Sequence, residues 1–198
     1  MGLKFVYKDG QSPLSEQGKK GLLIDTITTQ AELDEFEQKN IAKAIQWTLG
    51  KNISIGRLLS EEYLTQLHKK MYGEVWKWAG EYRTKETNIG VKSHMVEIEL
   101  RKLLDDVKYW IENEVYEPIE LAIRFKHKLV SIHCFPNGNG RHSRLMADLI
   151  MEKLYDAKYY SWGGSNLTKA NELRKQYISA LKQADNGSMK DLINFAQS

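Results

Sequence analysis

The sequence predicts an all-α fold with one small β-hairpin. Apolar residues recur at the three- and four-residue spacing of helices along most of the chain, whereas residues 82–92 alternate weakly around a glycine. The chain has 198 residues, 41% of them hydrophobic, which is enough to bury one sizeable core. We therefore expect one main folded domain.

The N-terminal part of the chain begins as a lead-in and continues as a helix. Glycine and proline stand among polar residues at positions 1–27, which is typical of an extended, partly ordered segment. Thr29-Gln30-Ala31-Glu32 then forms a capping box, a pattern that marks the start of a helix. The apolar residues that follow keep helical spacing to about Leu49, so a long helix is expected there.

The later helices follow from the same spacing. One is expected after Ser60, and the hairpin at residues 82–92 separates it from the rest. The others are expected at residues 95–114, 118–133, 140–155, 168–184 and 188–196.

Composition argues against several classes of protein. The net charge of +3, from 29 basic and 26 acidic residues, is too small to indicate nucleic-acid binding. No window approaches the roughly 18 apolar residues of a membrane-spanning helix, so no membrane partner is expected. A single cysteine, Cys134, excludes an internal disulfide; we interpret it as a buried structural thiol in a cytoplasmic protein.

The strongest chemical signal lies at residues 133–144, which read His-Cys-Phe-Pro-Asn-Gly-Asn-Gly-Arg-His-Ser-Arg. The flanking apolar patterns predict a helix, a tight loop and a second helix. Gly138 and Gly140 are expected to turn the backbone at positive φ and to let a ligand approach its N–H groups. The second helix adds unpaired donors and the positive end of its dipole, so the loop predicts an anion site.

The side chains of this stretch predict the anion and the chemistry. Arg141 and Arg144 are three residues apart, so both guanidinium groups project from one side of the first helical turn and can clamp phosphate oxygens. His133, with an ordinary pKa of about 6.5, can take a proton from a hydroxyl near neutral pH. Phe135 is assigned to packing the loop, and His142 to the helix surface. The pattern indicates a site for a nucleotide triphosphate.

This stretch resembles the signature of the Fic family, His-x-Phe-x-Asp/Glu-Gly-Asn-Gly-Arg-x-x-Arg, in every position but one. Residues 67–83 resemble the helix and Trp-Ala-Gly segment of the family, and residues 177–187 resemble its closing helices. The resemblance implies a Fic domain at residues 57–198, after a lead-in at 1–27 and a helical segment at 28–56.

Members of the family mostly transfer AMP from ATP to protein hydroxyls. The resemblance implies that His133 is the catalytic base. The ATP-binding residues that it implies are Gly138, Asn139, Gly140, Arg141 and Arg144.

The one mismatch is Asn137, where the family has an acidic residue that holds Mg²⁺. A neutral amide oxygen is a weaker ligand for this hard cation than a carboxylate, so we expect weak binding of Mg²⁺, or of Mn²⁺ in its place. The Asn-Gly-Asn-Gly-Arg-His variant, together with residues 28–41, resembles a bacterial branch labelled mobile mystery protein B.

The predicted hairpin corresponds to the flap of the family, which aligns a target segment by β-strand addition. Backbone pairing would then place the accepting hydroxyl. The flap residues expected to dock the target are Thr84, Thr87, Asn88, Ile89, Gly90 and Val91.

Glu37 is the acidic residue that helical spacing places within an apolar stripe. It lies four residues after Leu33 and four before Ile41, so its carboxylate needs a cationic partner. Many family members carry an inhibitory glutamate that pairs with the second motif arginine, here Arg144. Glu37 is the candidate and Glu32 the alternative; an interhelical ion pair without regulatory meaning is an equal interpretation.

The sequence is therefore interpreted as a protein adenylyltransferase, restrained by its N-terminal helix. Its partners would be ATP and an unknown target protein, with self-modification and homo-oligomer formation as further expectations. Two alternatives stay open: a Fic enzyme with altered chemistry, such as phosphoryl transfer or removal of AMP, and a non-catalytic nucleotide-binding protein of toxin–antitoxin type.

Overall fold

The structure is a computed structural model that describes residues 15–49, 52–157, 160–162 and 170–198. Residues 1–14 of the predicted lead-in and residues 168–169 at the predicted start of a late helix lie outside the described residues. Over the described ranges the elements are α1 Glu16–Lys19, α2 Gln30–Thr48, α3 Ile55–Leu58, α4 Glu61–Tyr72, the 3-10 turn η1 Ser93–Met95, α5 Val96–Glu112, α6 Pro118–Ile132, α7 Asn139–Tyr155, α8 Ala170–Asp185 and α9 Lys190–Gln197.

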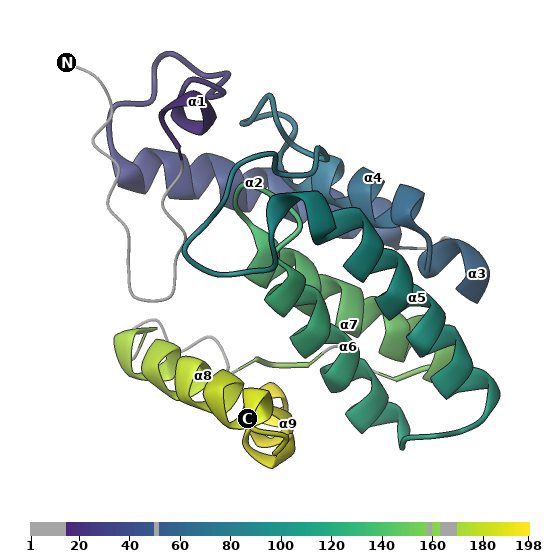
Figure 1. Cartoon of the computed structure of the whole chain (residues 1–198). Coiled ribbons are helices and arrows are strands. Elements are labelled where there is room, and N and C mark those ends of the chain that lie inside the picture. The colour runs from purple at the N-terminus through teal and green to yellow at the C-terminus, as the bar shows by residue number, and fades with distance from the viewer. Residues whose placement is uncertain (1–14, 50–51, 158–159, 163–169) are drawn as a thin grey trace.

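The described helices confirm the all-α prediction and pack around α6 and α7, which a short turn joins (Figure 1). α6 packs against α7, α5 covers α6, and α2 packs on α4. The core between them is apolar and contains large aromatic side chains, among them Trp76, Tyr63, Tyr72, Phe125 and Phe135. Helices α8 and α9 pack on each other around a smaller apolar cluster that includes Ile123 of α6.

The capping box at the start of α2 is confirmed. The Thr29 side chain accepts a hydrogen bond from the Glu32 backbone N–H at 3.2 Å, and the Glu32 carboxylate accepts from the Thr29 N–H at 2.9 Å. Glu32 is exposed and also accepts from Thr28, and these hydrogen bonds lower the pKa of its carboxyl group. It is thus a helix-capping residue at the surface.

The described part of the lead-in, residues 15–27, lies along the segment that follows α4. Leu22 forms an isolated antiparallel bridge with Trp76, and the Trp78 Nε1–H donates to the carbonyl of Gly18 at 3.1 Å. These contacts cover two aromatic side chains that themselves stack at 5.0 Å between ring centres. The lead-in therefore contributes to the core on the side of α2 and α4.

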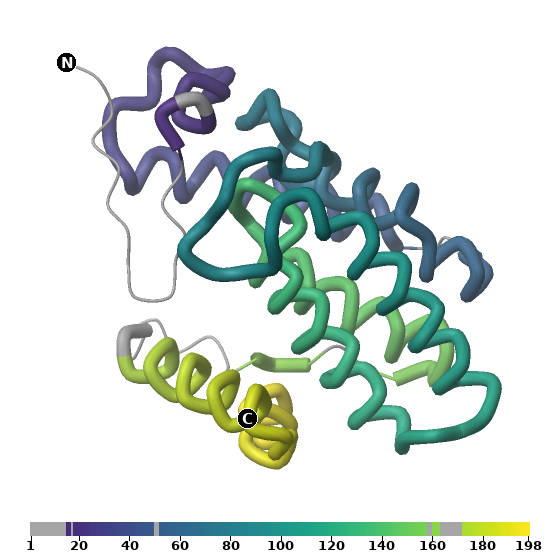
Figure 2. Tube along the Cα trace, in the orientation of Figure 1, coloured from purple at the N-terminus to yellow at the C-terminus, as the bar shows by residue number. Residues whose placement is uncertain are grey.

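The predicted β-hairpin at residues 82–92 is wrong, because this fully described segment contains no strand. Arg83 is buried at 4% exposure, and its guanidinium donates to the backbone carbonyls of Lys85 and Val91. Carbonyls that pair with a side chain are not available to a strand ladder. The segment is an irregular loop folded around Arg83, and it runs beside the turn between α6 and α7 (Figure 2).

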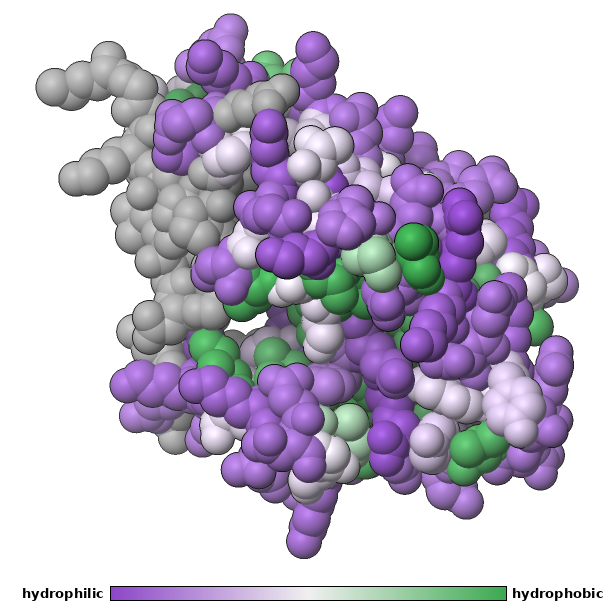
Figure 3. All heavy atoms as spheres, viewed as in Figure 1, coloured by the Kyte–Doolittle hydropathy of each residue, from purple (hydrophilic) through white to green (hydrophobic). Residues whose placement is uncertain are grey.

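The molecular face seen in Figure 3 is mostly hydrophilic, with hydrophobic residues scattered singly or in small groups. None of the helices in the described ranges is long and apolar enough to cross a membrane.

Candidate active site

The turn between α6 and α7 starts with a strained histidine. Helix α6 ends at Ile132, and His133 follows in the left-handed conformation, with φ 58° and ψ 60°. Such a backbone costs a non-glycine residue about 1–2 kcal/mol, so surrounding contacts must hold it. The backbone therefore fixes where the His133 side chain lies, one residue beyond the helix end.

The His133 ring is buried, with 6% of the residue exposed, and neither ring nitrogen has a partner in good hydrogen-bond geometry among the residues that the structure describes. Burial, and then the positive charge of Arg83, lower the pKa of His133 to about 4. At neutral pH the imidazole is therefore uncharged and has a lone pair free. This is the state that a general base requires.

Asn139 closes the loop that separates the two helices. Its Oδ1 accepts from the Phe135 N–H at 2.9 Å, and its Nδ2–H donates to the Phe135 carbonyl at 2.7 Å. Phe135 is fully buried and its ring stacks on that of His68 at 3.7 Å between centres. The prediction that Phe135 packs the loop against the core is confirmed.

His68 of α4 holds the same loop by hydrogen bonds. The Gly80 N–H donates to His68 Nδ1 at 3.0 Å, so His68 carries its proton on Nε2, which lies 3.0 Å from the Asn137 carbonyl and donates to it. Burial lowers the pKa of His68 well below its usual value, so the ring is neutral. The sequence alone did not predict this role of His68. The signal that could have revealed it is a histidine among the apolar positions of a helix.

The two glycines of the loop differ in conformation. Gly138 has a positive φ of 79°, as predicted, and a Cβ there would lie 2.5 Å from the ring of Tyr72. Gly140 was also expected at positive φ, but it lies within the first turn of α7, with nothing within 4 Å of a Cβ position. Gly138 thus makes the turn, and Gly140 leaves space beside the helix N-terminus.

Helix α7 begins without a side-chain cap, because its N-cap residue is Gly138. An uncapped helix N-terminus presents backbone N–H groups and a positive partial charge, which favour an anion. Arg144, one turn further on, has no ion pair within the described part of the chain, and its guanidinium lies 5.6 Å from the ring centre of Tyr177 on α8. These features make a positively charged environment, rich in hydrogen-bond donors, at the start of α7.

Glu37 of α2 reaches this environment, but not the arginine that was expected. The Arg141 Nη2–H donates to Glu37 Oε2 at 2.6 Å, and the Trp76 Nε1–H donates to Glu37 Oε1 at 2.7 Å. The predicted partner was Arg144; the orientation of α2 instead places Glu37 beside Arg141. The carboxylate is buried, with 6% of its side chain exposed, and each of its oxygens accepts a hydrogen bond from a different side chain.

The loop and its two helices lie in a part of the chain that matches a known protein family. A family model described as Fic/DOC matches residues 58–151, a range that includes the loop and its two helices. The chain contains a Fic/DOC domain.

Two relatives are named protein adenylyltransferases. The one from Nematostella vectensis is 25% identical over 169 residues, which cover 82% of this chain and 37% of the relative. The fic-1 protein of Caenorhabditis elegans is 27% identical over 149 residues, covering 70% and 28% respectively. This chain therefore spans only about a third of the length of these curated relatives.

Solved structures show the same fold. Residues 134–508 of C. elegans Fic-1 match with a TM-score of 0.69 at 22% identity, covering 90% of this chain and 51% of that chain. The BepC protein of Bartonella tribocorum matches with a TM-score of 0.65 at 14% identity, covering 92% and 97%. At such identities the likeness is one of fold.

Asn137 of the Fic/DOC domain uses its side chain within the loop. Its Oδ1 accepts from the Gly138 N–H at 2.6 Å. No group of three or more histidine, cysteine or acidic residues able to hold a metal occurs among the residues that the structure describes. The donor set therefore does not form a site for a divalent cation by itself.

Two further side chains near the motif are buried. Cys134 is 1% exposed, and burial raises the pKa of its thiol to about 12, which confirms its interpretation as a structural residue. His142 was expected at the surface, but it is 1% exposed and its Nε2 lies 3.0 Å from the Leu64 carbonyl. That expectation was wrong because the ring finds a backbone partner on α4.

The residues predicted to dock a target lie in the loop at 84–91. Ile89 is 41% exposed, and the Thr87 hydroxyl donates to the Ile89 carbonyl at 2.6 Å. A Cβ added at Gly90 would lie 2.6 Å from His133 Cβ, so the loop touches the histidine directly.

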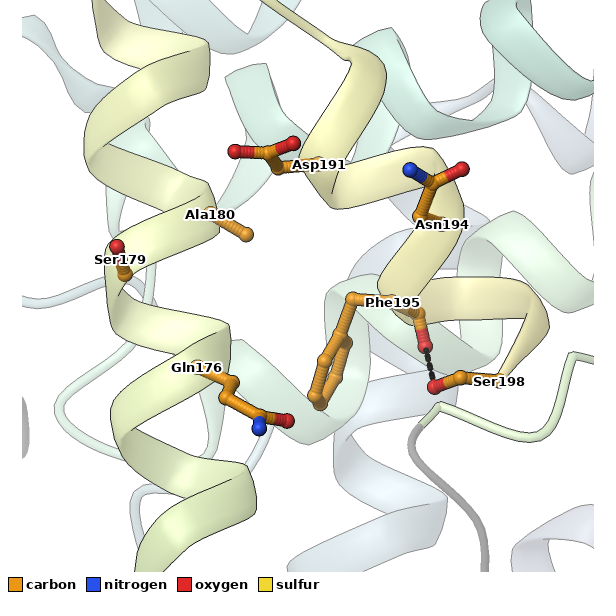
Figure 4. Close-up of a pocket in the computed structure, with 7 residues that line it drawn as sticks. All are labelled: Gln176, Ser179, Ala180, Asp191, Asn194, Phe195 and Ser198. Carbon is orange, nitrogen blue, oxygen red and sulfur yellow. Dashed lines mark hydrogen bonds between the residues drawn. The ribbon is translucent and has the colours of Figure 1, made fainter.

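A separate depression of about 390 Å³ lies between α8 and α9, where Gln176, Asp191, Asn194 and Phe195 are among its lining residues (Figure 4). None of the Fic/DOC motif residues lines it.

Proposed function

We propose that this chain transfers AMP from ATP to a hydroxyl side chain of a target protein. The observation that carries the proposal is His133, a buried and uncharged imidazole whose nitrogens have no well-aligned hydrogen-bond partner in the described part of the chain. It lies at one end of a short loop whose other end is an uncapped helix N-terminus. The names of the relatives from N. vectensis and C. elegans support it. Two Bartonella proteins of similar fold were solved with bound ADP and with bound AMPPNP, which supports ATP as the substrate.

In the proposed reaction, His133 accepts the proton of the target hydroxyl. The hydroxyl oxygen forms a bond to the α-phosphorus of ATP, the bond from that phosphorus to the bridging oxygen breaks, and pyrophosphate leaves. A triphosphate beside the ring favours the protonated imidazolium, so nucleotide binding raises the proton affinity of His133 above that of the free site.

The phosphates would lie at the start of α7, where the backbone N–H groups of Gly140 and Arg141 and the helix dipole stabilise negative charge. Arg144 would bind the terminal phosphate. Asn139 would keep its structural position, since both polar atoms of its side chain already bond the Phe135 backbone. Catalysis then comes mainly from positioning and charge stabilisation.

A divalent cation would arrive with the nucleotide phosphates. Asn137 offers one neutral amide oxygen, which already accepts from the Gly138 N–H, so this chain supplies little of the cation's coordination. When bound, such a cation neutralises phosphate charge.

The target would dock on the loop at residues 84–91. Arg83 already occupies the carbonyls of Lys85 and Val91, and the Thr87 hydroxyl occupies that of Ile89, so these three carbonyls would not pair with a target segment.

The contact of Glu37 with Arg141 supports the proposal that α2 regulates nucleotide binding. The carboxylate occupies the guanidinium that the phosphates require, so Glu37 would compete with ATP until the ion pair opens. Glu32, the alternative inhibitor, is exposed and engaged in capping, which leaves Glu37 as the proposed brake.

One observation favours a second function, nucleotide binding without turnover. The motif position that holds an acidic residue in the Fic signature is Asn137 here, and its oxygen serves the loop backbone. A protein with weak cation binding and an occupied Arg141 would bind nucleotide and react slowly or not at all.

Incubation of the purified chain with α-labelled and with γ-labelled ATP, in Mg²⁺ or Mn²⁺, tests the proposal. We expect α-label on protein, and its loss by about 10²–10⁴ in rate in His133→Ala. His94→Ala is the matched control, because His94 is exposed on η1. Transfer of γ-label would indicate phosphoryl transfer, and nucleotide binding without any label would favour the second function.

A further inference from the structure

Arg83 caps the C-terminal end of α6 with its side chain. The guanidinium Nε–H donates to the His133 carbonyl at 2.6 Å, and Nη2–H donates to the Ile132 carbonyl at 3.4 Å. The last carbonyls of a helix lack partners within the helix and carry partial negative charge, so a buried cation there is favourable. Arg83 therefore stabilises the end of α6 at the residue where the backbone turns left-handed.

The same guanidinium holds the loop that follows it. Nη1–H donates to the Lys85 carbonyl at 3.1 Å, and Nη2–H also donates to the Val91 carbonyl. One planar cation thus joins both ends of the loop to the end of α6. A lysine ammonium, which is a single point charge on a flexible stem, cannot satisfy carbonyls in this fork geometry.

Backbone hydrogen bonds also connect the loop to the end of α6 and the turn that follows it. The Arg83 N–H donates to the Cys134 carbonyl at 2.9 Å, and the Val91 N–H donates to the Ile132 carbonyl at 3.3 Å. Gly90, at φ 105°, packs so closely that a Cβ would lie 2.6 Å from His133 Cβ and 3.0 Å from Arg83 Nη2. The loop and the histidine are therefore one packed unit.

We propose that Arg83 is a positioning residue that holds His133 and the target-docking loop 84–91 in one fixed relation, so that a docked hydroxyl meets the imidazole. This inference rests on the proposed function for the identity of the base and of the docked segment. Arg83 itself acts through His133 and the loop, because its donors are engaged by backbone carbonyls.

Because Arg83 affects the pKa of His133, titration of His133 tests the proposal without an activity assay. Burial is the main cause of the lowered pKa of His133, and Arg83 is the charged group that adds to it. The Glu86 carboxylate lies 3.9 Å from Arg83 Nη1 and accepts from the Ser93 N–H and hydroxyl, and the Cys134 thiol is un-ionised near neutral pH. Loss of Arg83 removes a positive charge and loosens the cover over the ring, and both changes raise the pKa of His133.

Arg83→Ala and Arg83→Lys test the proposal, with Arg57→Ala as the control because Arg57 is exposed on α3. The histidine signals are titrated by NMR, with His133→Gln to assign the resonance. We expect the pKa of His133 to rise by about one unit in Arg83→Ala, and faster amide exchange throughout residues 84–92 in both Arg83 variants. Arg57→Ala should match the wild type.

Activity gives the second readout. In both Arg83 variants kcat for AMP transfer should fall by about 100-fold, while the Kd for ATP stays within about twofold, since misplacement by about an ångström has effects of this size. Lysine should fail to rescue. Gly90→Ala, which keeps Arg83 but adds a methyl group that displaces the loop from His133, should reproduce the loss of kcat and serves if the Arg83 variants do not fold.

The outcomes separate the two proposals. If the wild type transfers no AMP, the proposed function has failed, and the NMR and exchange results still decide whether Arg83 holds His133 and the loop together. Unchanged loop protection and an unchanged His133 titration in folded Arg83→Ala would overturn the inference, as would a lysine variant with wild-type kcat.

Discussion

Glu37→Gln removes the charge of the carboxylate that ties α2 to Arg141 while keeping its shape. The amide oxygen can still accept from Trp76 Nε1, so the main loss is the charge-assisted bond to Arg141 at 2.6 Å. A hydrogen bond to a charged group contributes about 1.5–3 kcal/mol, and the Arg141 side chain is 36% exposed, so solvent screens part of it. We expect the free energy of unfolding without nucleotide to fall by about 1–2 kcal/mol.

Loss of the same ion pair should also tighten nucleotide binding. If phosphates need Arg141, then the ion pair must open before ATP binds, and 1–2 kcal/mol corresponds to about a 5–30-fold change in affinity. Urea unfolding measures the first quantity and calorimetric titration with ATP the second. Glu35→Gln on the same helix is the control, because the salt bridge of Glu35 to Lys39 is exposed. This substitution should change the free energy of unfolding by less than about 1 kcal/mol and leave the affinity for ATP unchanged.

A Glu37→Gln protein that is destabilised but binds ATP with unchanged affinity would rule out competition between Glu37 and the phosphates. Glu37 would then be a structural ion-pair residue, the interpretation that the sequence left open.

Gly138→Ala should destabilise the protein by more than about 2 kcal/mol, because alanine is strained at this φ and its methyl group would meet Tyr72. Gly140→Ala, in a helical turn with open space, should be neutral or stabilising by about 0.5–1 kcal/mol in urea unfolding; equal losses at both glycines would contradict the assignment. The pKa of His142 falls from 6.5 to about 4 on folding, so its contribution to stability is complete above pH 6.5 and is lost as pH falls towards 4. The free energy of unfolding, measured in urea, should fall by about 1.4 kcal/mol per pH unit for this group as the pH decreases through that window. His142→Gln should reduce the pH dependence of the free energy of unfolding by that slope. Asn137→Asp should tighten Mg²⁺ in the presence of ATP by at least about tenfold in a metal titration; identical metal dependence in the two proteins would place Asn137 away from the cation.

Features that depend on neighbouring residues could be predicted from the sequence. Helical spacing and the Thr29 capping box are local, and both appear in the structure. The loop between α6 and α7 was also foreseen, because proline and glycine cannot continue a helix there. Local signals of this kind need no knowledge of how distant segments pack.

The partner of Glu37 could not be predicted. Spacing showed that its side chain faces inward, but Glu37 and Arg141 are 104 residues apart, and the orientation of α2 on the core decides which arginine it meets. Arg83 was missed for a related reason. A lone arginine is usually solvated, and only the folded chain shows the backbone carbonyls that its guanidinium binds.

The left-handed backbone at His133 sets stability against activity at one position. Glycine would adopt φ 58° without strain and would remove two buried ring nitrogens that have no well-aligned partner among the described residues, so His133→Gly removes two features that oppose folding. It would also delete the imidazole. Selection of variants for thermal tolerance alone should therefore accumulate substitutions at this site, whereas selection for turnover should keep histidine at the cost of a less stable fold.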